Sequence, residues 1–339
     1  MYTIFEVSDM NIYDIAQEAG VSISTVSRVL NNKTNVSPKT VEKVREVMRK
    51  NNYTPNSNAR ALVMNTTQTI GIITVDIRGS HYANVAHAVL EVFNKYGYNC
   101  LFCNAGRTPE EQKYYIELLL QSRLDGILFV GSVFQSPTIA RLVKDRLSQV
   151  PVVMVNGILD EPNVYSVICK EDEGMRDAVD FLCRKGKKEI AFVKSDQEKP
   201  SDELKESAYL EVITRYGLEP IIYRTEDKIK EAIPVMDEIL DEHPNLDAVV
   251  FSTDTMAAGG LKTITARGLK VPEQIEVIGY NNTEVCDILT PTLTSVDNQA
   301  EQLGTHAARI LYDVMEGRKT SKKLVLIPEV IYRETTLRQ

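Results

Sequence analysis

A regular alternation of apolar runs and helical stretches constrains the fold of this 339-residue chain more than any other feature. From Ile70 onward, the apolar runs of strand length are IGIITV, NCLFCNA, GILFVG, PVVMVNG, EIAFV, AVVFS and IEVIGY. Apolar residues recur at helical spacing near 82–96, 109–122, 137–147, 172–185, 203–216, 230–241, 255–267 and 298–316. Continuous apolar strands separated by helices form parallel sheets that are covered on both faces. Residues 70–339 are therefore predicted to be an α/β domain with two doubly wound parallel-sheet lobes.

Residues 10–55 follow a different pattern, which predicts a small all-α domain. In NIYDIAQEAG the apolar residues have helical spacing, and Gly20 ends the helix because glycine is free to adopt the left-handed conformation. Ser22 is placed to cap a second helix over 23–30, and Ser37, followed by proline, begins a third. Two short helices around a tight turn, braced by a third helix, form a helix-turn-helix.

The distribution of charge places a polyanionic partner at this N-terminal domain. The whole chain has a net charge of −8, but residues 11–65 hold eight lysine and arginine residues against four acidic residues. A basic N-terminal domain, the head, joined to an acidic remainder of the chain, the body, indicates a protein that binds nucleic acid through the head. Taken alone, the same feature is also compatible with scattered charge on an ordinary surface domain.

The second helix has the side chains that a reader of the major groove needs. Its Val26 and Val29 are expected to face inward, which leaves Arg28 on the opposite side. A helix fits the major groove, where an arginine can hold a guanine through its O6 and N7 atoms. The candidate base-reading residues are Ile23, Ser24, Ser27 and Arg28. The candidates for phosphate contacts are Ser22, Thr25 and Asn32.

These motifs resemble the lac-repressor/gal-repressor (LacI/GalR) family of bacterial transcriptional regulators. NIYDIAQEAGVSISTVSRVLN is similar to the DNA-binding head of that family, and NYTPNSNARAL at 52–62 is similar to its hinge segment. LDGILF, STDTMAAG, VPEQIEVIGYNN and LTPTLTSVDN are similar to markers of its body, which is itself periplasmic-binding-protein-like. The resemblance covers essentially residues 10–339. It implies a repressor that binds a near-palindromic operator in double-stranded DNA as a homodimer and responds to a small-molecule effector.

The resemblance also implies how the chain is divided. Residues 1–9 are an N-terminal extension, since Met10 fits the usual start of a family head, and residues 56–69 are a hinge helix and linker. The hinge residues expected to contact DNA are Asn58, Ala59 and Leu62. The resemblance places Leu62 as a wedge in a central base step of the minor groove, and the alternative is that this leucine packs on the body. Crossings between lobes near 160, 290 and 322 give lobe one about 70–160 and 291–322, and lobe two about 161–290 and 323–339.

The polar residues that follow the predicted strands are the candidates for binding the effector. Ligands of doubly wound folds bind beyond the carboxyl ends of the strands, which in this body face the cleft between the lobes. The candidates are Arg78, Tyr82, Ser132, Asn156, Lys170, Ser195, Lys205, Thr253 and Asn281. The alternative for each is a strand-end residue that caps a helix or contacts water. Asp254 is expected to be a helix N-cap rather than a ligand group.

The charges at these positions favour an anionic effector. Asn156, Lys170 and Asn281 stand where many family members have aspartate, and Lys205 stands where many sugar-binding members have arginine. Together with Arg78 from the other lobe, the two lysines could face an anionic group in a cleft of low dielectric. A sugar phosphate or a carboxylate is therefore expected. The alternative is a neutral site, in which acidic neighbours pair with these cations; the acidic candidates are Asp76, Asp196 and Glu198.

Other classes of protein fit the sequence less well. No G-x-G-x-x-G after a strand, P-loop or G-x-S-x-G motif is present and the four histidines are scattered, so neither an enzyme nor a cofactor is expected. Cys100 and Cys103 lie on a predicted strand, where positions three apart point to opposite faces, so this pair is a poor metal clamp.

The N-terminus does not resemble a signal peptide, and no apolar run approaches the roughly 18 residues that span a bilayer. A cytoplasmic location is therefore expected. A periplasmic-type solute-binding protein would share the body but would need a signal peptide and would not need the basic head. A regulator of the same family that answers to a protein co-effector, as in catabolite control, remains the second hypothesis.

Overall fold

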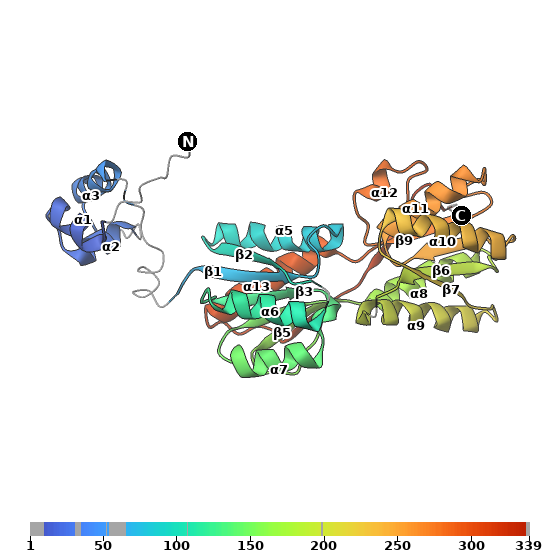
Figure 1. Cartoon of the computed structure of the whole chain (residues 1–339), viewed down its shortest axis with the longest axis horizontal. Coiled ribbons are helices and arrows are strands. Elements are labelled where there is room, and N and C mark those ends of the chain that lie inside the picture. Colours follow the sequence, from blue (N-terminus) through green and yellow to red (C-terminus); the bar gives the residue numbers. More distant parts are fainter. Residues whose placement is uncertain are drawn as a thin grey trace. The chain divides into compact units, whose positions relative to one another are not determined.

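The structure is a computed structural model that describes residues 10–30, 35–51, 53, 66–106, 108–197 and 199–336. The chain divides into two compact units, Met1–Thr67 and Gln68–Gln339 (Figure 1). The described part of the first unit is the helix-turn-helix expected from the sequence. Its helices are α1 (Ile12–Ala19), α2 (Ile23–Leu30) and α3 (Pro38–Lys50).

Local signals account for the ends of these helices. Asn11 caps α1 by accepting hydrogen bonds from the backbone of Tyr13 and Asp14, and Gly20 ends the helix with a φ of +59°. Ser37 caps α3 by accepting from the backbone of Thr40, with Pro38 at the first helical position. The apolar faces of the three helices then close one small core, which contains Ile15, Ala16, Ala19, Val26, Val29, Val44 and Val47.

The second unit is built on two six-stranded sheets, as far as the structure describes the chain. Sheet one has the order β11 (Lys323–Leu326), β5 (Val164–Cys169), β4 (Val152–Val155), β3 (Gly126–Val130), β1 (Thr69–Thr74) and β2 (Asn99–Asn104). Sheet two has the order β12 (Glu329–Ile331), β10 (Thr294–Asp297), β9 (Glu276–Tyr280), β8 (Ala248–Phe251), β6 (Ile190–Ser195) and β7 (Ile221–Thr225). All the described strand pairs are parallel except β10 with β12, which confirms the two doubly wound lobes.

Helices cover both faces of each sheet. In lobe one, α5 (Ser80–Lys95) and α13 (Ala300–Met315) pack on one face, and α6 (Pro109–Leu120) and α7 (Pro137–Arg146) pack on the other. In lobe two, the corresponding pairs are α8 (Glu171–Arg184) with α9 (Pro200–Arg215), and α10 (Ile229–Glu242) with α11 (Asp254–Ala266). Two shorter elements complete the body, the 3-10 turn η1 (Ser132–Phe134) and α12 (Val285–Ile288).

One close helix contact in each lobe depends on glycine. A Cβ on Gly304 of α13 would lie 2.4 Å from the backbone oxygen of Val85 in α5. A Cβ on Gly259 of α11 would lie 2.4 Å from the backbone oxygen of Ile229 in α10. Both helix pairs therefore approach more closely than any side chain larger than hydrogen would allow.

The chain passes between the lobes three times along its described course. It leaves sheet one after Cys169, returns to lobe one after Asp297, and crosses again after Leu326. Each crossing lies several residues later than the expected positions near 160, 290 and 322. The first difference arises because VYSVIC forms β5, a strand of sheet one that the apolar pattern did not reveal.

Four of the five described strands that the apolar pattern missed share a physical feature; the fifth, β10, is largely buried, but its sequence TSVD has a single apolar residue. Two residues of β5 are only half-buried, and in β7, β11 and β12 several side chains are partly or fully exposed. Such strands lie at or near the sheet edges and lack the continuous apolar run that identifies a central parallel strand.

The two cysteines of β2 do behave as expected: Cys100 packs against the core between sheet one and α5/α13, and Cys103 lies in the core on the opposite face. Among the described helices, none is both long and apolar enough to cross a bilayer.

Candidate DNA-binding surface and ligand pocket

The second helix of the head presents a polar surface opposite its buried valines. Ile23, Ser24 and Arg28 are exposed, whereas Thr25 and Ser27 are half-buried. The exposed Ser22 accepts a hydrogen bond from the backbone nitrogen of Thr25 at 3.2 Å, and hydroxyl pairs at 2.8 Å join it to Ser24 and Thr25. The start of α2 is therefore a cluster of hydroxyls beside an exposed isoleucine, with Arg28 one turn further on. Asn32, Asn58, Ala59 and Leu62 lie outside the described residues.

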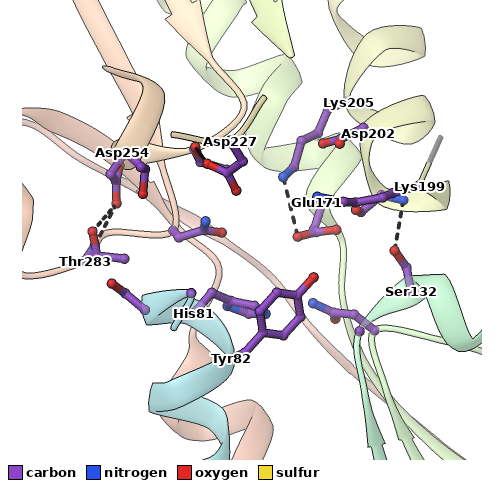
Figure 2. A pocket seen from close by; sticks show the side chains of 18 residues that line it. His81, Tyr82, Ser132, Glu171, Lys199, Asp202, Lys205, Asp227, Asp254 and Thr283 are labelled. Atoms are coloured by element: carbon purple, nitrogen blue, oxygen red, sulfur yellow. Dashed lines mark hydrogen bonds and ion pairs between the residues drawn. The ribbon is translucent and has the colours of Figure 1, made fainter. Parts of the chain in front are cut away.

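The body contains a pocket where the strand ends of both lobes meet (Figure 2). Lobe one contributes the start of α5 and the residues that follow β3 and β4. Lobe two contributes the starts of α8, α9 and α11 and the residues that follow β7 and β9. The lining residues are Gly79, Ser80, His81, Tyr82, Gly131, Ser132, Asn156, Glu171, Lys199, Ser201, Asp202, Lys205, Asp227, Thr253, Asp254, Thr255, Asn281 and Thr283.

Most of the residues expected to bind the effector lie in this pocket. The structure brings together Tyr82, Ser132, Asn156, Lys205, Thr253 and Asn281. Three other candidates are not part of the lining. Arg78 is largely exposed and pairs with Asp76, with a distance of 2.6 Å between Nη2 and Oδ2, and Lys170 pairs with Glu173 on α8. Ser195 is buried on β6, where its hydroxyl accepts from the backbone nitrogen of Gln197.

Three acidic residues of the lining were not recognised from the sequence. Glu171 and Asp227 each come two residues after the end of a strand, β5 and β7 respectively, so each was missed together with its strand. Asp202 lies in the first turn of α9, which begins at Pro200 rather than at the expected residue 203. A search for acidic residues just after short strands at or near the sheet edges could have found the first two.

Lys205 is held by groups of its own lobe. Its side chain is buried, and its Nζ lies 3.8 Å from Glu171 Oε1 and 3.3 Å from the backbone oxygen of Ser252, to which it donates. The ammonium also lies 3.9 Å from the centre of the Tyr280 ring, whose hydroxyl in turn donates to the backbone oxygen of Glu171. The ammonium of Lys205 therefore pairs with the buried carboxylate of Glu171 and makes a cation–π contact with the ring of Tyr280.

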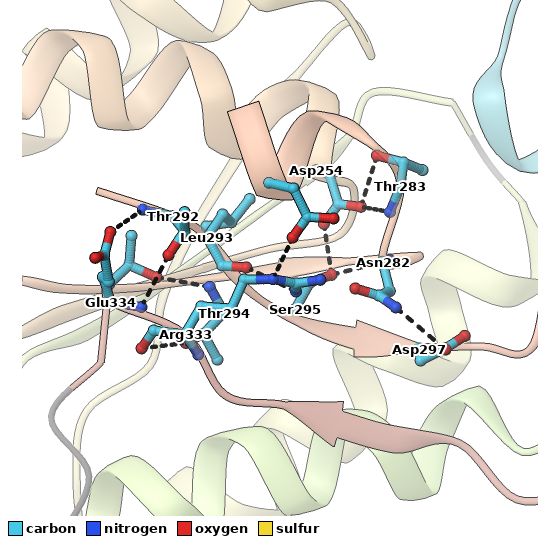
Figure 3. Close-up of polar contacts among 12 residues, drawn as sticks. Asp254, Asn282, Thr283, Thr292, Leu293, Thr294, Ser295, Asp297, Arg333 and Glu334 are labelled. Carbon is cyan, nitrogen blue, oxygen red and sulfur yellow. Dashed lines mark hydrogen bonds and ion pairs between the residues drawn. The ribbon is translucent and has the colours of Figure 1, made fainter. Parts of the chain in front are cut away.

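Asp254 does not cap α11, contrary to the expectation from the sequence. Thr253 is the capping residue, because its hydroxyl oxygen accepts from the backbone nitrogen of Met256 and its hydrogen goes to Asp227 at 2.6 Å. Asp254 is the first residue of the helix, and its buried carboxylate accepts from the backbone and hydroxyl of Thr283 at 2.7 and 2.9 Å and from the Ser295 hydroxyl at 2.5 Å (Figure 3). Burial raises the pKa of Asp254, and these hydrogen bonds oppose the rise. Asp254, which follows β8, is thus hydrogen-bonded beside the pocket to Thr283, which follows β9, and to Ser295 of β10.

A short hydrogen-bonded chain connects the two lobes beside the pocket. The side-chain nitrogen of Asn298, in the second crossing, lies 2.8 Å from Asn281 Oδ1 in lobe two and 3.1 Å from His81 Nδ1 in lobe one. Since Asn298 donates to Nδ1, the histidine proton is assigned to Nε2. Burial, and then the charge of Lys205, lower the pKa of His81 to about 4, so the imidazole is neutral near pH 7.

This histidine predicts a particular loss of stability in acid. Its pKa is lowered by folding, so the unfolded chain binds the proton more readily between about pH 6.5 and 4. The contribution of the neutral His81 to the free energy of unfolding is therefore fully present above pH 6.5 and is lost as the pH falls toward 4. Because the side chain is partly exposed, we expect an effect on the order of 2 kcal/mol. Urea unfolding across this range should show a shallower loss for His81→Gln than for the unchanged chain.

His87 provides a matched control for that measurement. It is exposed on the same helix, α5, so His87→Gln controls for the loss of an imidazole that lies outside the hydrogen-bonded chain of His81, Asn298 and Asn281. Identical curves for His81→Gln and His87→Gln would contradict the assignment of a neutral, hydrogen-bonded His81.

Comparisons with known proteins match both units of the chain. Residues 11–56 match the family described as bacterial regulatory proteins, lacI family, and residues 179–336 match the periplasmic binding protein-like domain. An HTH-type transcriptional regulator of Lachnoclostridium phytofermentans is 34% identical over 332 residues, covering 96% of this chain and 99% of that protein. Catabolite control protein A of Priestia megaterium is 32% identical over 333 residues, covering 97% and 99%.

Solved structures agree with these matches. The lac repressor dimer bound to operator and the anti-inducer ONPF has a TM-score of 0.85 at 27% identity, covering 97% of this chain and 99% of that one. The complex of the transcriptional regulator CelR with cellobiose has a TM-score of 0.70 at 26% identity, covering 96% and 99%.

A helix-turn-helix head and a two-lobed body with a periplasmic-binding-like domain define a DNA-binding transcriptional regulator. The chain belongs to the LacI family of bacterial regulatory proteins.

Proposed function

We propose that this protein is a cytoplasmic repressor whose affinity for its operator changes when a small molecule binds between the lobes of the body. The observation that carries the proposal is the pocket, because its lining comes from both lobes and lies beside the first two of the three crossings. A ligand that contacts both lobes favours one relative arrangement of them, and such domain closure is a common way to transmit binding. The CelR complex with cellobiose and the lac repressor complex with the anti-inducer ONPF support a small-molecule ligand for a protein of this fold.

The structure removes most of the support for an anionic effector. The anionic effector expected from the sequence depended on Arg78, Lys170 and Lys205. Arg78 and Lys170 are bound to carboxylates and do not line the pocket, and Lys205 faces Glu171. Lys199 is therefore the remaining cation of the pocket lining that supports a sugar phosphate or a carboxylate as effector.

DNA recognition by the head follows from the exposed face of α2. In the proposed complex, Arg28 grips a guanine in each half of a near-palindromic operator, and the hydroxyls at the start of the helix contact phosphates. Leu62 is proposed as the wedge in the central base step.

The proposed functional unit is a homodimer, because one head offers few base contacts and two related heads read an inverted repeat. The similarity to the lac repressor, which was solved as a dimer bound to operator, supports this assembly. Apolar side chains on β2 and α6 also remain exposed and would be covered by a second copy; they include Leu101, Phe102, Tyr114 and Leu118.

The second candidate function is control by a protein co-effector. The relatives named catabolite control protein A favour it, because their sequences match nearly the whole chain. The pocket lined by both lobes supports a small-molecule effector directly, so that proposal takes precedence.

A gel shift with DNA selected from a random pool tests the proposed function. We expect the selected sequences to be near-palindromes, the complex to contain two chains per operator by sedimentation, and a small molecule that shifts the thermal unfolding of the chain to change its operator affinity. Recovery of DNA without a consensus, or a monomer with full operator affinity, would contradict the proposal.

A further inference from the structure

The charges that line the pocket do not suit an anion. The lining holds four carboxylates, of Glu171, Asp202, Asp227 and Asp254, against two lysines. Lys205 is placed against Glu171, and the neutral His81 adds no positive charge. The pocket therefore carries an excess of negative charge that only Lys199 and Lys205 offset, and a phosphate or a carboxylate would be repelled from it.

Asp202 is the carboxylate that most clearly lacks a partner. Its residue is 4% exposed, and its Oδ2 is buried without a hydrogen-bond partner among the described residues. A buried polar atom without a partner costs free energy, and for a charged group the cost is larger. Burial raises the pKa of Asp202, and the nearby Lys205 and Lys199 oppose that rise, while Glu171 and Asp227 add to it.

The position of Asp202 at the start of α9 explains only in part why a carboxylate is buried there. In the first turn of α9, the partial positive charge of the helix N-terminus favours a carboxylate. That effect supplies no hydrogen-bond donor to Oδ2. A donor or cation brought by a ligand would satisfy the atom, and Figure 2 shows Asp202 and Asp227 on the lobe-two side of the same cavity.

We infer that the effector carries a positively charged amino group, as an amino sugar does, and that Asp202 is its main partner, with Asp227 close by. This inference rests on the proposed function, since it names the chemical class of ligand for the same pocket. The rest of the lining suits the hydroxyls of such a molecule, because side-chain hydroxyls and amides surround the cavity; they include Ser80, Ser132, Asn156, Thr255 and Asn281.

A bound metal ion is a different way to supply positive charge, and the geometry does not favour it. Among the described residues, no group of three or more histidine, cysteine or acidic side chains is placed to hold a metal ion. An organic cation with several hydroxyls uses both the carboxylates and the neutral polar groups of the lining.

Calorimetry on the full chain tests the inference with defined probes. The probes are glucosamine, galactosamine and mannosamine, their N-acetyl forms, the parent hexoses and the hexose 6-phosphates. We expect at least one amine to bind about tenfold or more tightly than its N-acetyl form, because only the amine has a positive charge. The preference should disappear as the pH rises through the pKa of the amine.

Asp202→Asn and Asp196→Asn form a matched pair of variants for the same measurement. Both remove one negative charge from lobe two, but Asp196 is exposed and is not part of the pocket lining. Asp202→Asn should weaken amine binding roughly tenfold with little effect on neutral sugars, and Asp196→Asn should bind as the unchanged chain does. Thermal unfolding of Asp202→Asn checks that the variant is folded.

Several results would overturn the inference. They are tighter binding of a hexose or a 6-phosphate than of every amine, no binding of any amine, or amine binding that a folded Asp202→Asn variant leaves unchanged. If a neutral or phosphorylated sugar binds and changes operator affinity, the amine inference fails while the proposed regulator stands. If the chain does not bind operator DNA at all, the proposed function itself fails.

Discussion

Arg28→Ala is expected to weaken operator binding by about 1–3 kcal/mol for each half-site and to relax the preference for one guanine in each half. Arg28 is exposed on the face of α2 opposite the buried Val26 and Val29, so its guanidinium is free of the head's own core. In the proposed homodimer two heads read one operator, so the loss applies twice. Fluorescence anisotropy with the selected operator, and with variants carrying one substituted base pair, measures both the affinity and the preference.

Arg28→Lys is the matched variant for that experiment. It keeps the positive charge but removes the planar fork that holds two guanine atoms at once. We expect it to retain the salt-dependent, non-specific affinity while losing much of the guanine preference. If the preference at every base pair survives both substitutions, Arg28 does not read DNA.

Asp254→Ala is expected to lower the free energy of unfolding by about 3–4 kcal/mol. The substitution leaves the buried backbone nitrogen and hydroxyl of Thr283 and the hydroxyl of Ser295 without their shared acceptor (Figure 3). It also frees the loop after β9, which carries Asn281 and Thr283 into the pocket. Urea unfolding measures the loss, and ligand calorimetry on the folded variant reports the effect on the pocket.

Asp254→Asn separates charge from hydrogen bonding at this position. The amide oxygen can still accept from Thr283, and the amide nitrogen can donate to Ser295, so we expect a smaller loss of about 1–2 kcal/mol. Equal losses for alanine and asparagine would show that the network contributes nothing beyond the negative charge.

The two units of the chain differ in how much the sequence revealed. In the head, every helix boundary expected from capping residues and apolar spacing is confirmed, because caps and turns depend on neighbours a few residues away. In the body, the central strands and the helices were recognised from their periodicity. β5, β7, β10, β11 and β12 were not, and two pocket residues that follow β5 and β7, Glu171 and Asp227, were lost with those strands.

The sequence by itself determined the family, the helix-turn-helix and the parallel two-lobed body, because local caps, apolar periodicity and short motifs carry that information. Only the tertiary structure decided the charge of the pocket. It placed Arg78 and Lys170 beside carboxylates outside the lining and Lys205 against Glu171, and it buried Asp202 Oδ2 without a partner among the described residues. The physical reason is that burial and ion pairing depend on distances between segments far apart in the chain, and the same lysine can bind a ligand or balance a neighbour according to which carboxylate the fold brings within a few ångströms.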